Sequence, residues 1–196
     1  MSQPLSKLAG KRLAPLQPLL KLPEDAAAAV KDCQLATEAL DRLQAGGFLM
    51  EATRLLAHAL PRREAVWWTC MCAGHTEPPD LAEADRKARE AAELWVRQPN
   101  DRNRIAAKQL SDATELSSPE SWAALAVFFC GESITPEDQP KVPPKPHIAG
   151  RTLGGAVVLS AVRIDPKRQE QRLQRFLESG RNIAAGGAGR LPHETA

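Results

Sequence analysis

The sequence predicts an all-α fold, a compact multi-helix domain of antiparallel helices with a proline-rich strap and C-terminal helices. Two observations favour this class. Hydrophobic residues make up 43% of the 196 residues and tyrosine is absent, so mainly Ala and Leu must fill the core, and these residues favour helix over strand. In addition, apolar residues recur at helical spacing in segments that begin near Pro, Ser or Asp and end near Gly or Pro.

The segment from Leu60 to Cys72 is expected to form a buried central helix. It contains two of the four tryptophans and two of the four cysteines. Pro61 suits the first turn of a helix, because its missing N–H would have no partner there. Only one narrow stripe of the segment is small or polar, and a helix that is apolar over most of its circumference is normally buried.

Adjacent tryptophans, Trp67 and Trp68, lie in the middle of this segment. Neighbouring residues on a helix point about 100° apart, so the two rings must pack against different parts of the protein. We expect one ring to contact the first two helices of the domain. The other is expected to contact the helix that carries Trp122 and Phe128.

Three charged residues, Arg62, Arg63 and Glu64, begin the central helix. Arg63 precedes Trp67 by one turn and Glu64 precedes Trp68 by one turn, so either charge is able to lie over an indole ring. Two interpretations stay open. The charges are paired for architecture, or one of them faces a groove and recognises a partner. With the two tryptophans, these residues form the candidate partner-binding or structural centre.

The chain is predicted to begin with a flexible arm, residues 1–22, which is basic and contains three prolines. A helical core domain, residues 23–131, follows. Its expected helices cover about 24–45 with a break near 33–37, and then 48–59, 61–74, 79–97, 100–113 and 118–131. The helix over 79–97 is the clearest, because Leu81, Ala84, Ala88, Ala91 and Trp95 trace one apolar stripe. The last helix has a capped start, with Ser118 at the N-cap position and Pro119 in the first turn.

Composition changes after the core domain. Five prolines between residues 132 and 148 predict an extended strap, and residues 149–180 are predicted to form a C-terminal helical pair that packs on the core. Within this pair we expect one helix over 153–162, whose small residues allow close approach of another helix, and a second from Asp165-Pro166 to about Glu178. Residues 181–196 are expected to be a flexible tail.

Charge is distributed unevenly along the chain. Residues 1–23 carry a net charge of +4, residues 24–140 carry −8 and residues 141–196 carry +6. An acidic body with basic ends argues against a protein that binds nucleic acid over its whole surface. No run of the sequence is long and apolar enough to span a bilayer, and the cysteine spacing is not that of an extracellular disulfide framework. We therefore expect a cytoplasmic protein.

A search for catalytic and metal-binding motifs yields no catalytic, cofactor-binding or metal-ligating residue. Cys70 and Cys72 would point about 200° apart on a helix, so they cannot easily share one zinc ion with His75. The histidines lack metalloprotease spacing, and the chain has neither a nucleophile elbow nor a P-loop. We expect no cofactor and no metal, with the cysteines acting as small buried hydrophobic residues.

Two segments together resemble a family of small bacterial helical proteins of unknown activity. They are the string Leu60-Pro61-Arg62-Arg63-Glu64-Ala65-Val66-Trp67-Trp68 and the strap from Val142-Pro143-Pro144 to Leu153-Gly154-Gly155-Ala156-Val157. The resemblance covers about residues 24–164. It implies a bacterial accessory or adaptor protein, associated with type VI secretion gene neighbourhoods, and it implies no activity for any residue.

Three classes of function remain open from the sequence. The first is a non-enzymatic protein-interaction module, an adaptor or chaperone-like protein whose partner is a bacterial secretion or accessory component. The second is an enzyme whose site is assembled from scattered residues around Arg63 and Glu64, with His58. The third is a nucleic-acid or membrane-surface binder that uses the basic C-terminal helix, although nucleic acid is the less favoured partner. The sequence leaves the oligomeric state open.

Overall fold

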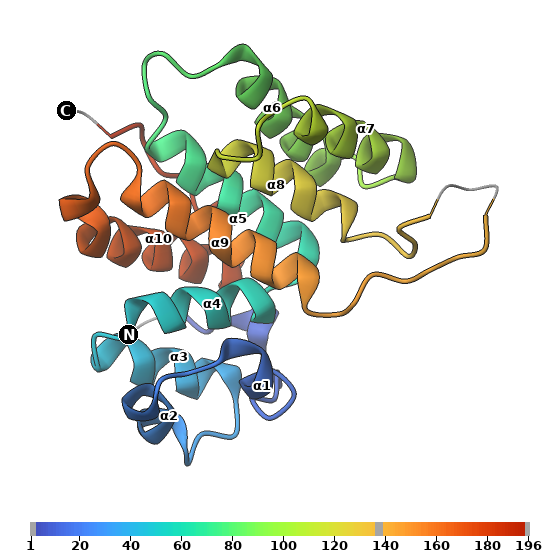
Figure 1. Cartoon of the computed structure of the whole chain (residues 1–196). Helices are drawn as coiled ribbons and strands as arrows, with labels where there is room; N and C mark the ends of the chain where they lie inside the picture. Colours follow the sequence, from blue (N-terminus) through green and yellow to red (C-terminus); the bar gives the residue numbers. More distant parts are fainter. Residues whose placement is uncertain (1–2, 136–138, 195–196) are drawn as a thin grey trace.

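The computed structural model describes residues 3–135 and 139–194, and it confirms the all-α class. These residues form ten α-helices and two short 3-10 helices, with no β-strand among them. Figure 1 shows α5 in the middle of the molecule, with α6, α7 and α8 on one side and α1 to α4 on the other. The predicted central position of the helix that contains Trp67 and Trp68 is therefore confirmed.

The helices of the core domain follow the predicted order. They are α2 (Glu24–Val30), α3 (Ala36–Ala45), α4 (Leu49–Ala59), α5 (Arg62–His75), α6 (Glu83–Arg97), α7 (Asp101–Asp112) and α8 (Pro119–Phe128). The break expected near residues 33–37 separates α2 from α3. Helix α8 begins at the predicted cap, because the Ser118 hydroxyl accepts a hydrogen bond from the backbone N–H of Ser121 at 3.0 Å.

The prediction of a flexible N-terminal arm is wrong for the residues that the structure describes. Residues 3–22 contain a 3-10 helix, η1 (Ser6–Leu8), and a short helix, α1 (Gln17–Leu20). Four leucines of this segment are buried in the core: Leu8, Leu13, Leu16 and Leu20. The burial of these leucines offsets the conformational entropy that is lost when the segment becomes ordered. The prolines and charges of the segment had favoured a flexible arm instead. Residues 1–2 of the predicted arm lie outside the described residues.

The proline-rich strap is irregular, as predicted. Residues 132–135 and 139–147 lie outside any helix, and residues 136–138 are outside the described part of the chain. The strap folds back on itself, because the backbone N–H of Ile134 donates to the carbonyl oxygen of Val142 at 2.9 Å. Figure 1 shows this loop projecting from the helical body between α8 and α9.

Two helices follow the strap, as predicted for the C-terminal helical pair. They are α9 (Ile148–Val162) and α10 (Gln169–Ala184), joined by the 3-10 helix η2 (Pro166–Arg168). Helix α9 begins five residues before the predicted start. The close approach expected of its small residues is confirmed at Gly155, where an added Cβ would lie 2.5 Å from the ring of Trp122 on α8.

The prediction of a flexible C-terminal tail is also wrong within the described residues. Helix α10 extends to Ala184, and the chain beyond it packs against the body. The Ser179 hydroxyl donates to the carbonyl oxygen of Gly189 at 2.5 Å, and the backbone N–H of Glu194 donates to the carbonyl oxygen of His75 at 2.7 Å. Residues 185–194 are therefore an ordered part of the fold, and residues 195–196 of the predicted tail lie outside the described residues.

Candidate functional site

The three charges that begin α5 contact three different segments of the chain. Arg62 donates to the carbonyl oxygen of Pro146 in the strap at 2.8 Å, and Arg63 donates to the carbonyl oxygen of Val96 on α6 at 2.5 Å. Glu64 pairs with Lys7 of the N-terminal segment at 2.7 Å. The structure thus separates these side chains instead of gathering them around one cavity, and each one holds a neighbouring segment against α5.

The indole N–H groups of the two tryptophans donate to different residues, and neither hydrogen bond goes to the first two helices of the domain or to α8. Trp68 is fully buried, and its indole N–H donates to the carbonyl oxygen of Phe176 on α10 at 2.7 Å. Trp67 is only partly buried, and its indole N–H donates to the carbonyl oxygen of Ala188 at 2.7 Å. Both indole hydrogen bonds therefore reach α10 and the residues after it.

Neither Arg63 nor Glu64 is held over an indole ring. Arg63 donates instead to the carbonyl oxygen of Val96, and Glu64 pairs with Lys7. Cations lie instead against Phe128 on α8. The Arg104 guanidinium is 5.2 Å from the centroid of that ring and the Lys108 ammonium is 5.7 Å from it. The cation–π chemistry that the sequence suggested at α5 is therefore found at the contact between α7 and α8.

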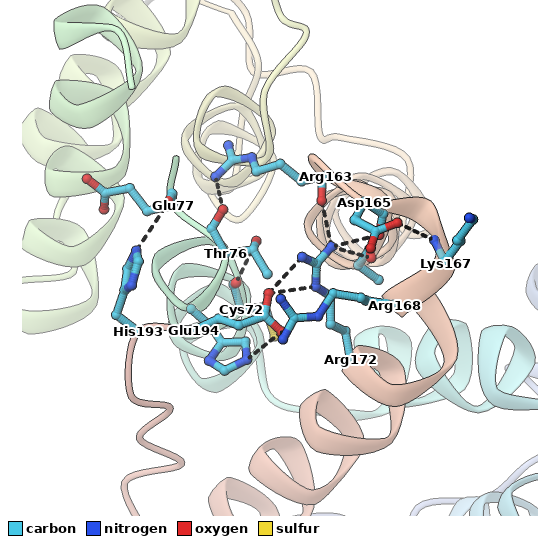
Figure 2. A network of polar contacts seen from close by, with 12 residues as sticks. Cys72, Thr76, Glu77, Arg163, Asp165, Lys167, Arg168, Arg172, His193 and Glu194 are labelled. Carbon is cyan, nitrogen blue, oxygen red and sulfur yellow. Dashed lines mark hydrogen bonds and ion pairs between the residues drawn. The ribbon is translucent and has the colours of Figure 1, made fainter. Parts of the chain in front are cut away.

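A buried polar network joins the end of α5, the α9–α10 corner and the C-terminal segment (Figure 2). At its centre, Arg172 pairs with Glu194 at 2.7 Å, and their side chains are 2% and 7% exposed. The same guanidinium donates to the carbonyl oxygens of Ala161 at 3.0 Å and of Arg163 at 2.6 Å. Arg172 thereby satisfies carbonyl groups at the C-terminal end of α9 that have no partner within the helix.

Two further basic groups face Glu194 in this network. Arg168 lies 3.0 Å from one of its carboxylate oxygens, and the ring of His75 lies 4.0 Å from the same oxygen. Burial alone raises the pKa of Glu194, but the hydrogen bond and charge of Arg172, with the charges of Arg168 and His75, outweigh it and lower the pKa. Glu194 is therefore a carboxylate at neutral pH, and its ion pairs hold the C-terminal segment against the rest of the protein.

A second buried pair lies between α8 and the end of α9. Glu120 is fully buried, and its carboxylate accepts two hydrogen bonds from the guanidinium of Arg163. Arg163 also donates to the carbonyl oxygen of Thr76 at 3.3 Å. A charge pair in the interior is stabilised only when both partners are hydrogen-bonded in this way. Both buried pairs are therefore engaged in holding helices together.

The cysteines are free thiols in the structure. Cys70 and Cys72 are fully buried, and burial raises the pKa of both thiols. Burial also raises the pKa of Cys130 to about 11. High thiol pKa values make poor nucleophiles and poor metal ligands at neutral pH. Among residues 3–135 and 139–194, no three His, Cys, Asp or Glu side chains are grouped closely enough to hold a metal ion.

A hollow of the described surface lies beside α7, the end of α8 and the first residues of the strap. We call it the α7–strap hollow. Its volume is about 970 Å³. Ile105, Phe128 and Ile134 give it an apolar wall, and Ile105 and Ile134 are 36% and 39% exposed. Its remaining residues are Asp101, Arg102, Arg104, Ala106, Lys108, Gln109 and Thr135.

Sequence reasoning missed the residues of the buried network. From the sequence alone, the basic residues of the last helix, which include Arg172, favour a solvated helix face. One signal was present, because Arg172 directly precedes Leu173 and lies one turn before Phe176, on the apolar side of the helix. No local pattern in the sequence connects Glu194 with His75, since that contact depends on the path of the chain after α10.

The fold and these contacts define an all-α protein with two buried ion pairs and a surface hollow that has one apolar wall. The chain belongs to DUF6931, a family of unknown function, which it matches over residues 39–184. The matched region ends at Ala184, the last residue of α10. No curated protein and no solved structure matches the chain. In the described part of the chain, no helix is both long and apolar enough to cross a membrane.

Proposed function

We propose that this protein is a non-enzymatic interaction module that binds a partner protein at the α7–strap hollow. In this proposal it acts as a cytoplasmic adaptor or chaperone-like protein of a bacterial system. Type VI secretion is the system that the sequence resemblance suggests. The four free thiols support a reducing compartment.

The α7–strap hollow is the observation that carries this proposal. Ile105 and Ile134 are exposed apolar side chains on two different segments, and the partly buried ring of Phe128 lies between α7 and the strap. Apolar side chains that remain exposed together, with polar residues around them, are typical of protein-interaction sites. The strap is not part of the helical body and projects from it (Figure 1).

The charges around the hollow indicate the chemistry of the partner. Arg102, Arg104 and Lys108 line it together with one carboxylate, Asp101. The Arg104 and Lys108 cations also lie against Phe128. Arg104 pairs with Asp101 at 2.8 Å, and Lys108 pairs with Asp112 at 2.5 Å. Among the described residues, only Arg102 of these three cations therefore has no ion-pair partner. A partner segment whose apolar side chains cover the wall, with a carboxylate beside Arg102, would match the hollow.

An enzyme built around Arg63 and Glu64 has less support. These side chains contact α6 and the N-terminal segment, respectively, and do not converge on one cavity. A nucleic-acid or membrane-surface binder that uses the basic C-terminal helix also has less support. Arg172 pairs with Glu194 and Arg181 pairs with Asp41, so part of the helix's positive charge is neutralised within the protein.

Ile105→Glu should remove partner binding while leaving the fold intact. The substitution places a carboxylate in the apolar wall, whereas an exposed helix position tolerates it to within about 0.5 kcal/mol of stability. Leu94→Glu is the matched control, because Leu94 is 39% exposed on α6 and does not line the hollow. Affinity purification of both variants from the native host, with quantitative mass spectrometry, measures the effect. Equal recovery of the same partner by both variants would contradict the proposed site.

A further inference from the structure

A second hollow, on another face of the molecule, is lined by α4, α9 and the end of α1. We call it the α4–α9 hollow, and its volume is about 490 Å³. It shares no lining residue with the α7–strap hollow. We propose that it binds the phosphate group of a small organic phosphate. This activity is independent of the partner binding proposed above.

The charged residues that line the α4–α9 hollow are all basic. They are Lys21, which follows α1, Arg54 on α4 and Arg151 on α9. The nearest ion-pair partner of these cations is Glu51, one turn before Arg54, at 3.7 Å; it does not line the hollow. Three cations from three segments therefore surround one space without a carboxylate in its wall. Such a space favours an anion of the ligand.

His58 is the second observation that points to a ligand. It lines the hollow and is only 8% exposed, yet neither ring nitrogen forms a hydrogen bond within the described residues. Its ring is wedged against the backbone of α9, where a Cβ added to Gly150 would lie 2.3 Å from Nδ1. The ring nitrogens themselves are not among the buried atoms that lack a partner, so they are open to a group from outside the protein. A phosphate oxygen in the hollow would supply a hydrogen-bond partner.

The surroundings of His58 also favour an anion. Burial lowers the pKa of His58 to about 4, and the positive charges of Arg62 on α5, Arg151 on α9 and His147 before α9 act in the same direction. The imidazole is therefore neutral at pH 7 in the free protein. A bound dianion would oppose both effects, so the pKa of His58 should rise on binding.

Phosphate fits this site better than carboxylate does. A phosphate monoester carries close to two negative charges at pH 7 and three acceptor oxygens. Arg54 and Arg151 present guanidinium groups, which recognise such oxygens in pairs. The rest of the wall is apolar and includes Leu19, Met50, Val158 and Leu159. An organic group attached to the phosphate would cover this wall, and the volume is that of a small-molecule site.

Phenyl phosphate is the probe for this proposal, with the full-length protein and the histidine signals of NMR spectra as the readout. We expect saturable shifts of the His58 signals at millimolar concentration or below, and a rise of more than one unit in the pKa of His58. Arg151→Glu should weaken binding at least tenfold, and so should Lys21→Glu. Both positions are exposed, and thermal melts confirm that the variants are folded. Arg102→Glu, in the α7–strap hollow, is the control that should bind normally.

Several results would overturn the proposal. If phenyl phosphate does not shift the His58 signals, the ligand does not bind in this hollow. If Arg151→Glu binds phenyl phosphate as tightly as the wild type does, the basic residues do not attract the ligand. Benzoate binding as tightly as phenyl phosphate would refute the preference for phosphate. If inorganic phosphate binds as tightly as phenyl phosphate, the apolar wall has no role in binding. Co-sedimentation with phosphatidic acid vesicles, lost in Arg151→Glu, would refute the assignment to a soluble ligand. Partner binding by Ile105→Glu tests only the α7–strap hollow, so its result does not affect the proposal for the α4–α9 hollow.

Discussion

Trp68→Ala is expected to destabilise the protein by about 3–5 kcal/mol, the usual cost of truncating a large aromatic residue in a core. Trp68 is fully buried, and its ring contacts α10 so closely that a Cβ added to Gly180 would lie 3.0 Å from the indole nitrogen. The substitution also removes the hydrogen bond that the indole N–H donates to the carbonyl oxygen of Phe176. A loss of this size approaches the total stability of a marginal domain, so soluble yield should fall sharply.

Trp67→Ala is the matched comparison for this prediction. Trp67 lies at the adjacent position of α5 but is only partly buried, and its hydrogen bond goes to Ala188 beyond α10. We expect a smaller loss of stability. Urea unfolding of the two variants measures the difference. Equal stability of Trp68→Ala and the wild type would show that this ring is not part of the core.

Arg172→Met is expected to cost about 3 kcal/mol, the lower end of the cost of breaking a buried ion pair, because Arg168 still lies 3.0 Å from the Glu194 carboxylate. The substitution removes the strongest contact of Glu194 and the donor for two carbonyl groups at the end of α9. Glu194 should then release the C-terminal segment, which would become sensitive to limited proteolysis. Arg175→Met is the control, because Arg175 is exposed on the same helix.

A double-mutant cycle isolates the contribution of the Arg172–Glu194 pair. Arg172→Met combined with Glu194→Gln removes both charges, so the double variant should be more stable than the sum of the single effects predicts. Urea unfolding of the four proteins provides the data. Strict additivity of the two substitutions would mean that the pair is not coupled and that Arg172 acts only through the carbonyl groups of α9.

Local sequence signals predicted the helices well because helix starts are determined by nearby residues. Ser118 caps α8 as expected, and Asp165 accepts a hydrogen bond from the backbone N–H of Lys167 at 3.0 Å at the predicted start after α9. The central position of α5 also followed from its apolar circumference. These features depend on residues within one or two turns of each other.

The ends of the chain could not be predicted in the same way. Leucines spaced irregularly between prolines gave no periodic signal in residues 3–22, although four of them are buried. The ordered path of residues 185–194 depends on contacts with residues more than a hundred positions earlier, such as the hydrogen bond from Glu194 to His75. For the same reason, the sequence drew attention to the charges of α5 and missed both hollows, whose walls combine residues from distant segments.

Site-specific photo-crosslinking in the native host tests the central claim, partner binding at the α7–strap hollow, most directly. A photoreactive amino acid replaces Ile105 in one strain and Leu94 in another, two side chains of similar exposure on neighbouring helices. We predict one dominant crosslinked protein from position 105, absent from position 94 and lost when Ile134→Glu is added. Crosslinking of the same protein from position 94 but not from position 105 would contradict the claim.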